Sequence, residues 1–373
     1  MKLAIVAAAM VAGVCSSAAA QPFVEGGAAM GMAIGEGPAA WGDLDGDGWV
    51  DLWCSGAVWV NQGGKSFTKV VAPGAGVLAD LNNDGMADLV SFAPVATYKT
   101  VKGADGALSF VPIPLPVLPP TSSRGASAVD VNGDGFLDVY IAGFEDWEKQ
   151  ITYPSFLLLN DRGEKFTLAM TYGERRARGV TACDFDEDGD QDIYVSNYRL
   201  QPNVLWVNDG HGVMVDEAVK RNAVATSAGF GGGHSIGACF GDFDGDGHFD
   251  LFAGNFAHVD TRGDQPKSRF LKNLGAAKGW VFEDLHECGV WYQESYASPG
   301  AADFDNDGRL DLLFTTVYAD ASFGKKNHAV LYRNEGEAGK PWSFADRTAG
   351  SGLENLVPTY QAAWADVDGD GNV

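Results

Sequence analysis

Short apolar runs and aspartate-rich loops alternate along the whole chain. The stretch "SIGACFGDFDGDGHFDLFAGN" (residues 235–255) shows the unit, in which a run of small apolar residues enters a loop and a β-prone run leaves it. Short runs of this kind, rich in β-branched and aromatic residues and bounded by glycine and aspartate, predict strands. Each loop is therefore expected to join two strands.

Further strands follow each loop. The runs "VWVNQGG", "VLWVNDG", "FLKNLG" and "VLYRNEG" end in Asn-x-Gly turns, which favour the left-handed backbone conformations of hairpins. Outer strands such as "SFTKVV" and "WVFEDL" come next. Four antiparallel strands per unit, repeated seven times without a convincing helix, predict an all-β, seven-bladed β-propeller over residues 21–373.

The last blade is expected to be incomplete in this chain. The seventh loop stops at Val373, before its closing aspartate and its exit strand. Residues 23–25, ahead of the first loop, lie where the outer strand of another blade should be. We expect them to pair with strands encoded beyond Val373, because propellers are often closed by the opposite terminus.

The loop motif is Asp-x-Asp/Asn-x-Asp-Gly-x-x-Asp. Its first residues are Asp43, Asp80, Asp130, Asp184, Asp242, Asp303 and Asp366. Position 3 is Asp45, Asn82, Asn132, Asp186, Asp244, Asp305 or Asp368. Position 5 is always aspartate, before an invariant glycine: Asp47, Asp84, Asp134, Asp188, Asp246, Asp307 and Asp370. Position 7 varies: Trp49, Met86, Phe136, Asp190, His248 and Arg309. Position 9 is aspartate wherever the chain reaches it: Asp51, Asp88, Asp138, Asp192, Asp250 and Asp311.

This spacing suits a hard cation. Alternate residues of a tight loop aim their oxygens inward, and Ca²⁺ takes six to eight oxygen ligands in flexible geometry, whereas Mg²⁺ demands a strict octahedron. Position 7 is free to vary if only its backbone carbonyl is a ligand. The sequence therefore predicts up to seven Ca²⁺ sites, weaker in the second and third loops, where asparagine replaces aspartate at position 3.

Two other aspartate-rich loops are excluded. An EF-hand needs a bidentate glutamate at position 12 and flanking helices, but position 12 here is Cys54, Ser91, Ile141, Val195, Ala253 or Phe314. Nonapeptide β-helix arrays repeat far more tightly than these loops. An isolated motif of this kind is often an ordinary polar turn, but seven copies are not explained that way.

The charge and the N-terminus bear on location and partners. The formal net charge is −24, which disfavours nucleic acid and anionic membranes as partners. Residues 1–20 are typical of a signal peptide, with Lys2, an apolar run and a small-residue cleavage site. We therefore expect a secreted, periplasmic or cell-surface protein with no membrane span in the mature chain. Its four cysteines, Cys54, Cys183, Cys239 and Cys288, are expected to be free buried thiols.

The sequence resembles the FG-GAP/VCBS class of propeller repeats, the integrin-α-like type, over roughly residues 23–373. The run "LYRNEGEAGKPWSFADRTAGSGL", continuing to "ADVDGDG", is similar to proteins related to cartilage acidic protein, in which an ASPIC/UnbV domain typically follows the propeller. The resemblance implies Ca²⁺ binding by the loops. Among the segments that enter the loops, only Phe240-Gly241 keeps the name-giving Phe-Gly pair.

These features favour a non-enzymatic calcium-binding scaffold for an unknown protein or glycan ligand. A calcium-dependent polysaccharide lyase and a structural propeller serving a C-terminal ASPIC/UnbV domain are the alternatives. No catalytic constellation is visible. Ser235 lies in a Gly-x-Ser-x-Gly motif without the required strand and helix, and residues 262–264 spell Arg-Gly-Asp. The ten tryptophans could line a carbohydrate-binding face, although packing between blades is the expected role.

Overall fold

The architecture is all-β, as the sequence predicts. The computed structural model describes residues 23–35, 37–257, 259–260, 263–285, 288, 290, 296–316, 328–336, 343–354 and 361–373. Within these ranges the only helix is one 3₁₀ turn, Ala276–Lys278. The expected signal peptide, residues 1–20, lies outside them. None of the described helical segments is long and apolar enough to cross a bilayer.

Six four-stranded antiparallel sheets form the blades. Blade one contains β1(Ala39–Gly42), β2(Asp51–Cys54), β3(Ala57–Asn61) and β4(Phe67–Val71). Blade two contains β5(Gly76–Ala79), β6(Asp88–Phe92), β7(Val95–Lys102) and β8(Leu108–Ile113). Blade three contains β9(Ser123–Val129), β10(Asp138–Gly143), β13(Pro154–Asp161) and β14(Lys165–Glu174).

Blade four contains β15(Ala177–Cys183), β16(Asp192–Asn197), β17(Val204–Val207) and β18(Val215–Asp216). Blade five contains β19(Ser235–Gly241), β20(Asp250–Asn255), β23(Arg269–Asn273) and β24(Phe282–Asp284). Blade six contains β25(Tyr296–Ala302), β26(Asp311–Thr316), β27(Val330–Asn334) and β28(Phe344–Asp346). Two small hairpins, β11(Glu145–Asp146) with β12(Ile151–Thr152) and β21(Val259–Asp260) with β22(Gly263–Asp264), extend blades three and five.

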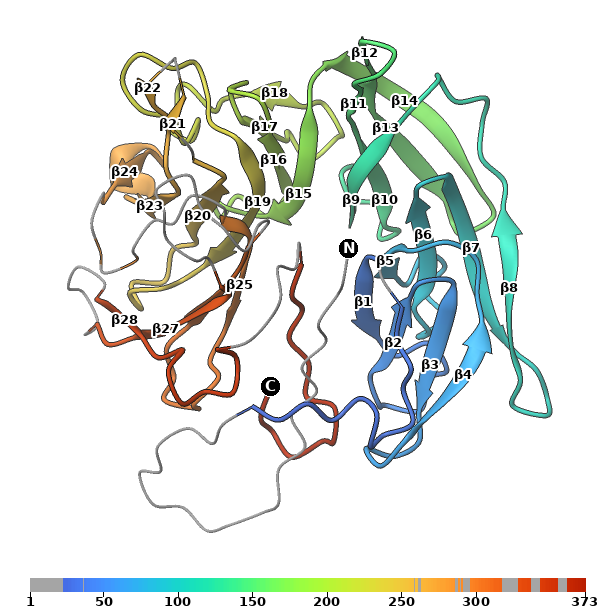
Figure 1. Cartoon of the computed structure of the whole chain (residues 1–373). Helices are drawn as coiled ribbons and strands as arrows, with labels where there is room; N and C mark the ends of the chain where they lie inside the picture. The colour runs from blue at the N-terminus through green and yellow to red at the C-terminus, as the bar shows by residue number, and fades with distance from the viewer. Residues whose placement is uncertain are drawn as a thin grey trace.

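The first strand of each blade lines the centre of a ring, and consecutive first strands are neighbours (Figure 1). This crowding explains the small residues that the sequence places there. A Cβ atom added at Gly125 would lie 2.6 Å from the carbonyl oxygen of Arg178 in the next blade, and one at Gly179 would lie 2.7 Å from that of Ile236. Only glycine permits so close an approach between strands.

The core lies between adjacent blades. The second strands β2, β10, β16, β20 and β26 are buried along their whole length, and each contributes a large aromatic side chain. These are Trp53, Tyr140, Tyr194, Phe252 and Phe314. Cys54, Cys183, Cys239 and Cys288 are free thiols, as the sequence predicts, and all of them except the partly buried Cys239 are buried.

The ring has a seventh position, where the structure differs from a complete blade. Six blades are complete, and residues 361–373 supply the seventh loop without a regular strand among the described residues. This segment (red) lies between β25–β28 and β1–β4 (Figure 1). The seven blades that the sequence predicts therefore correspond to six complete four-stranded sheets and one partial unit.

Residues 23–32 also lie at the seventh position. The backbone N–H of Phe23 donates to Ser351 O at 2.6 Å, and Met30 O accepts from Phe67 N–H at 2.8 Å. The outer strands of three complete blades are tied to the preceding blade by the same kind of bond, at Phe166, Phe282 and Phe344. Residues 23–32 thus join blade six to blade one. Pairing of residues 23–25 with strands beyond Val373 stays a prediction.

Candidate metal centres

The first aspartate of each loop is held by the backbone of its own loop. In the first loop, Gly46 N–H donates to Asp43 Oδ1 at 2.7 Å and Gly48 N–H donates to Asp43 Oδ2 at 2.8 Å. The bond from position 6 recurs in all seven loops, at 2.8–3.1 Å. Gly48 has φ 88°, a left-handed conformation that favours glycine, so the invariant glycine makes the turn.

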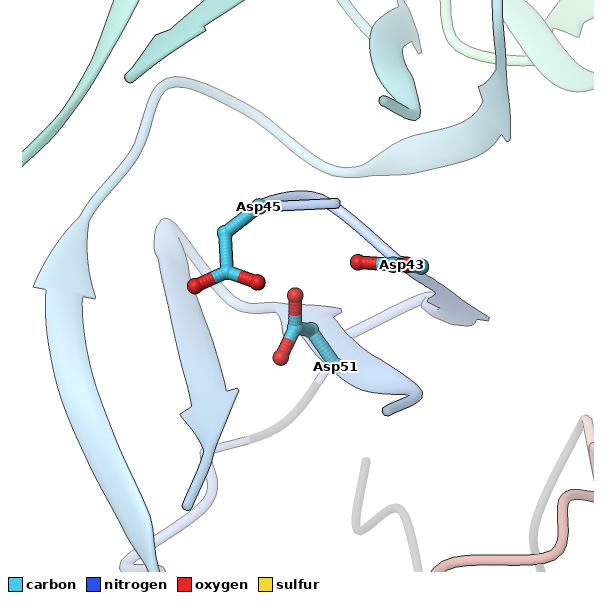
Figure 2. A group of neighbouring side chains, drawn as sticks. All are labelled: Asp43, Asp45 and Asp51. Carbon is cyan, nitrogen blue, oxygen red and sulfur yellow. The ribbon is translucent and has the colours of Figure 1, made fainter. Parts of the chain in front are cut away.

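Carboxylates at positions 1, 3, 5 and 9 converge in these loops. In five loops, oxygen atoms from three aspartates lie within 4.8 Å of one another. Figure 2 shows Asp43, Asp45 and Asp51 with their carboxylates turned toward a common space. The position 5 side chain is oriented by the N–H of position 7, as for Trp49 N–H to Asp47 Oδ1 at 2.9 Å. Carbonyl coordination by the position 7 residues remains a prediction.

Several of these oxygens are buried without a partner. Oδ1 of Asp45, Asp186 and Asp305, all at position 3, accepts no hydrogen bond from any described residue, and neither does Oδ1 of Asp190. Leaving buried polar atoms unsatisfied costs free energy unless a ligand or ion satisfies them. Oxygen-only donors aimed into a small space fit a hard divalent cation. The residues present therefore fit Ca²⁺ in the first, fourth and sixth loops.

The second and third loops differ at position 3. In the second, Asn82 Nδ2 donates to Asp84 Oδ2 at 2.9 Å, so the amide already satisfies one carboxylate oxygen. In the third, Asn132 Oδ1 accepts the N–H of Asp134 at 3.0 Å. Because each of these loops has one carboxylate fewer, its negative charge is lower and its attraction for a cation is weaker. This agrees with the weaker binding that the sequence predicts for the two loops.

The closing aspartate at position 9 has a structural role that the sequence did not reveal. In blade three, Asp138 Oδ2 accepts the N–H of Val131 at 3.1 Å, and its Oδ1 accepts the N–H of Asn160 on β13 at 2.8 Å. The same pair of bonds is made by Asp51, Asp88, Asp192, Asp250 and Asp311. The closing aspartate thus braces its loop against the third strand.

Burial raises the pKa of the closing aspartates, and nearby loop carboxylates add to the effect. The pKa rises to about 6 for Asp88, to about 7 for Asp51, Asp138 and Asp311, and to about 8 for Asp192 and Asp250. Burial also raises the pKa of Asp186 at position 3 to about 6. So much unbalanced negative charge in a half-buried site favours a bound cation.

Basic side chains reach into some of the loops. Lys272 on β23 contacts Asp244 and donates to Asp246 Oδ2 at 2.8 Å. Arg333, at the matching position on β27, donates to Asp305 Oδ2 at 2.5 Å and to Asp307 Oδ2 at 2.7 Å. Blades one, three and four carry Val60, Leu159 and Val207 at this position. The fifth and sixth loops therefore contain a basic side chain that the sequence analysis missed. Longer contacts of Lys102 with Asp45 Oδ2 (3.3 Å) and of Arg221 with Asp186 Oδ2 (3.4 Å) place a basic side chain beside the first and fourth loops as well.

The other sequence motifs do not form a site. Ser235 is fully buried at the start of β19, where its Oγ bonds Asn255 Oδ1 at 2.5 Å and accepts from Asn203 Nδ2 at 2.8 Å. No nucleophile elbow exists there. In the Arg-Gly-Asp tripeptide, Arg262 lies outside the described residues.

Six complete blades, each with an aspartate loop between its first two strands, define a β-propeller built from aspartate-loop repeats. The model of the FG-GAP-like repeat matches residues 80–141, 184–253 and 303–373. The chain belongs to this family.

Its curated relatives include cartilage acidic protein 1 of Mus musculus, 26% identical over 264 residues, and that of Homo sapiens, 25% identical over 263. Both alignments cover 67% of this chain but only 37% and 36% of the relatives. A crystal structure of a Lactobacillus plantarum protein shares the fold, with a TM-score of 0.50, 13% identity and 83% coverage of each chain.

Proposed function

We propose that this protein is a secreted, non-enzymatic scaffold whose propeller is stabilised by calcium and presents its surface to a protein or glycan. The observation that carries the proposal is the set of buried, unpartnered carboxylate oxygens at position 3 of repeated loops. Asp43, Asp45, Asp47 and Asp51 and their counterparts would hold Ca²⁺, which supplies charge neutralisation and coordination. Mg²⁺ fits less well because it keeps its waters and its octahedral geometry.

Calcium at extracellular concentration is sufficient for a large effect. Extracellular calcium modules have a Kd of roughly 10⁻⁴ to 10⁻³ M. At about 1 mM Ca²⁺ and a Kd near 0.1 mM, each site contributes about 1.4 kcal/mol to the free energy of unfolding. Seven independent sites would contribute about 10 kcal/mol, which is comparable with the stability of a whole domain.

The test is to measure bound metal and the melting temperature together. The protein is dialysed against 1 mM CaCl₂ (about the concentration assumed above) or against EGTA, and calcium is counted by elemental analysis. We expect several Ca²⁺ per chain and a melting temperature that falls in EGTA and returns with Ca²⁺ but not with equal Mg²⁺. An unchanged melting temperature, or no retained calcium, would overturn the proposal.

A further inference from the structure

The face opposite the aspartate loops carries a different chemistry. The aspartate loops join the first and second strands of each blade, so the connections from second to third strand lie at the other end of the antiparallel sheet. In blade three this connection contains the β11–β12 hairpin, which projects beyond the sheet (Figure 1). In blade four it runs from Tyr198 to Asn203. Arginines from both blades gather here.

Two of these arginines share one carboxylate. Glu145 on β11 is buried, and it accepts Nε–H bonds from Arg176 at 2.7 Å and from Arg199 at 2.5 Å. Among the described residues, neither arginine donates a hydrogen bond from its terminal amino groups. Glu145 therefore fixes the orientation of both guanidinium groups while their outer donors stay available.

Aromatic rings connect these groups to two more arginines. Each guanidinium carbon lies near a ring centroid: Arg199 over Trp147 at 3.9 Å, Arg178 over Tyr198 at 4.5 Å and over Phe144 at 4.8 Å, and Arg124 over Phe144 at 5.7 Å. Arg124 and Arg178 lie on the adjacent inner strands β9 and β15. The four arginines with Phe144, Trp147 and Tyr198, which we call the arginine face, thus form one continuous surface across two blades.

The arginine face has surplus positive charge in a chain whose net charge is −24. Arg176 and Arg199 share Glu145, whose single negative charge balances only one of these two guanidinium groups. Of the other acidic side chains on these segments, Asp146 is paired with Lys149 Nζ at 2.6 Å, and Glu148 on the hairpin and Glu174 at the end of β14 are exposed. Like charges held this close repel one another. A bound anion would relieve that repulsion.

We propose that the arginine face binds a polysaccharide that carries carboxylates, such as a polyuronate. A guanidinium group pairs with carboxylate through two parallel hydrogen bonds, and several spaced arginines match a polymer with a carboxylate on each repeat. Trp147, 56% exposed, adds a flat apolar surface against which a sugar ring can pack. The proposal rests on the scaffold function above and names its ligand class.

The experiment measures binding of short oligogalacturonates, too short to gel with calcium, to the calcium-loaded full chain by isothermal titration calorimetry. Arg124→Gln and Trp147→Ala remove side chains that are exposed in the folded protein. Lys165→Gln is the matched control, because Lys165 is an exposed cation of blade three at the β13–β14 turn, which packs against Asn82 on the aspartate-loop side. Melting temperatures show whether each variant is folded.

We expect wild-type protein to bind the oligogalacturonate. Arg124→Gln should weaken binding by about tenfold, the usual effect of losing one charge-assisted contact. Trp147→Ala should weaken it by about tenfold through the loss of an aromatic packing surface, while Lys165→Gln leaves it unchanged. Neutral maltooligosaccharide should not bind. No binding to wild type, equal weakening by Lys165→Gln, or preference for oligoglutamate, which would indicate an acidic protein partner, overturns the proposal.

The two proposals fail separately. Calcium-dependent stability without oligogalacturonate binding would refute the arginine face alone. Binding without any effect of EGTA on the melting temperature would refute the calcium proposal alone. Release of unsaturated products from the oligogalacturonate, followed by ultraviolet absorbance, would contradict the non-enzymatic part of the proposed function.

Discussion

Asn61 in blade one donates from Nδ2 to the carbonyl oxygen of Val367 in the seventh loop, at 2.8 Å and across 306 positions of the chain. The same bond links four other pairs of neighbouring units: Asn160 to Leu81 O, Asn208 to Val131 O, Asn273 to Phe185 O, and Asn334 to Phe243 O. The seventh loop is therefore hydrogen-bonded to blade one in the same way as the aspartate loops of these other units are bonded to the blade that follows them. Blade two is the exception, since Thr100 donates to Ala87 O within its own blade.

The asparagine that bonds to the neighbouring blade should contribute more to the free energy of unfolding than Thr100, which takes its place in blade two. Asn160→Ala removes two Nδ2 bonds and the bond that Oδ1 accepts from Gly163 N–H. We expect it to lower the free energy of unfolding by about 2–4 kcal/mol, because each buried bond contributes about 1 kcal/mol. Urea denaturation in calcium measures this. Thr100→Ala is the control, and equal losses for the two variants would refute an inter-blade role.

Stability measurements in EGTA should distinguish the loop aspartates that hold the backbone from those that act only as calcium ligands. Asp138→Ala leaves the N–H groups of Val131 and Asn160 without an acceptor, so we expect a loss of about 2–4 kcal/mol with or without calcium. Asp134→Ala, at the exposed position 5, should cost little in EGTA and should reduce the stabilisation that calcium adds. Calcium titrations of both variants, followed by melting temperature, check the pair. Identical behaviour of the two variants would contradict the division of roles.

The basic residues in the fifth and sixth loops should oppose calcium binding. Lys272→Met keeps the apolar stem but removes the charge beside Asp244 and Asp246. We expect the Kd of that loop for Ca²⁺ to fall by about tenfold, or about 1.4 kcal/mol. Leu159→Met, at the matching position of blade three, is the control. Terbium luminescence and calorimetry report the affinity, and weaker binding by Lys272→Met would show that the lysine supports the site instead.

Calcium-free protein should lose stability as pH rises. The pKa of Asp51 rises to about 7 and that of Asp250 to about 8 on folding, above the ordinary value of 3.8. Protonation therefore favours the folded state. This contribution is fully present below about pH 4 and is lost as pH rises through about 7 to 8.

In EGTA we thus expect a lower melting temperature at pH 8 than at pH 5. In calcium the trend should reverse, because cation binding requires the deprotonated carboxylates. Melting curves at both pH values test this. A calcium-free protein that is more stable at pH 8 would contradict the assignment of buried, uncompensated carboxylates.

Local pattern predicted most of the fold. Apolar runs flanking each aspartate loop became β1 and β2 and their counterparts, and Gly48 has the left-handed backbone that the motif requires. What escaped prediction depends on residues brought together from separate strands. The distance along the chain from closing aspartate to bracing asparagine varies from 10 to 23 residues, so no fixed motif reveals it. Lys272 and the arginine face are hidden for the same reason.

The closing aspartate accepts two backbone hydrogen bonds, and this has a consequence for how such repeats diverge. Because Asp88 secures its loop through the backbone N–H groups of Leu81 and Thr100, a repeat can lack the carboxylate at position 3 while its loop stays attached to its blade. The second loop has Asn82 at this position and keeps its closing aspartate. The number of cation-binding loops can then change repeat by repeat during evolution, while the propeller fold is kept.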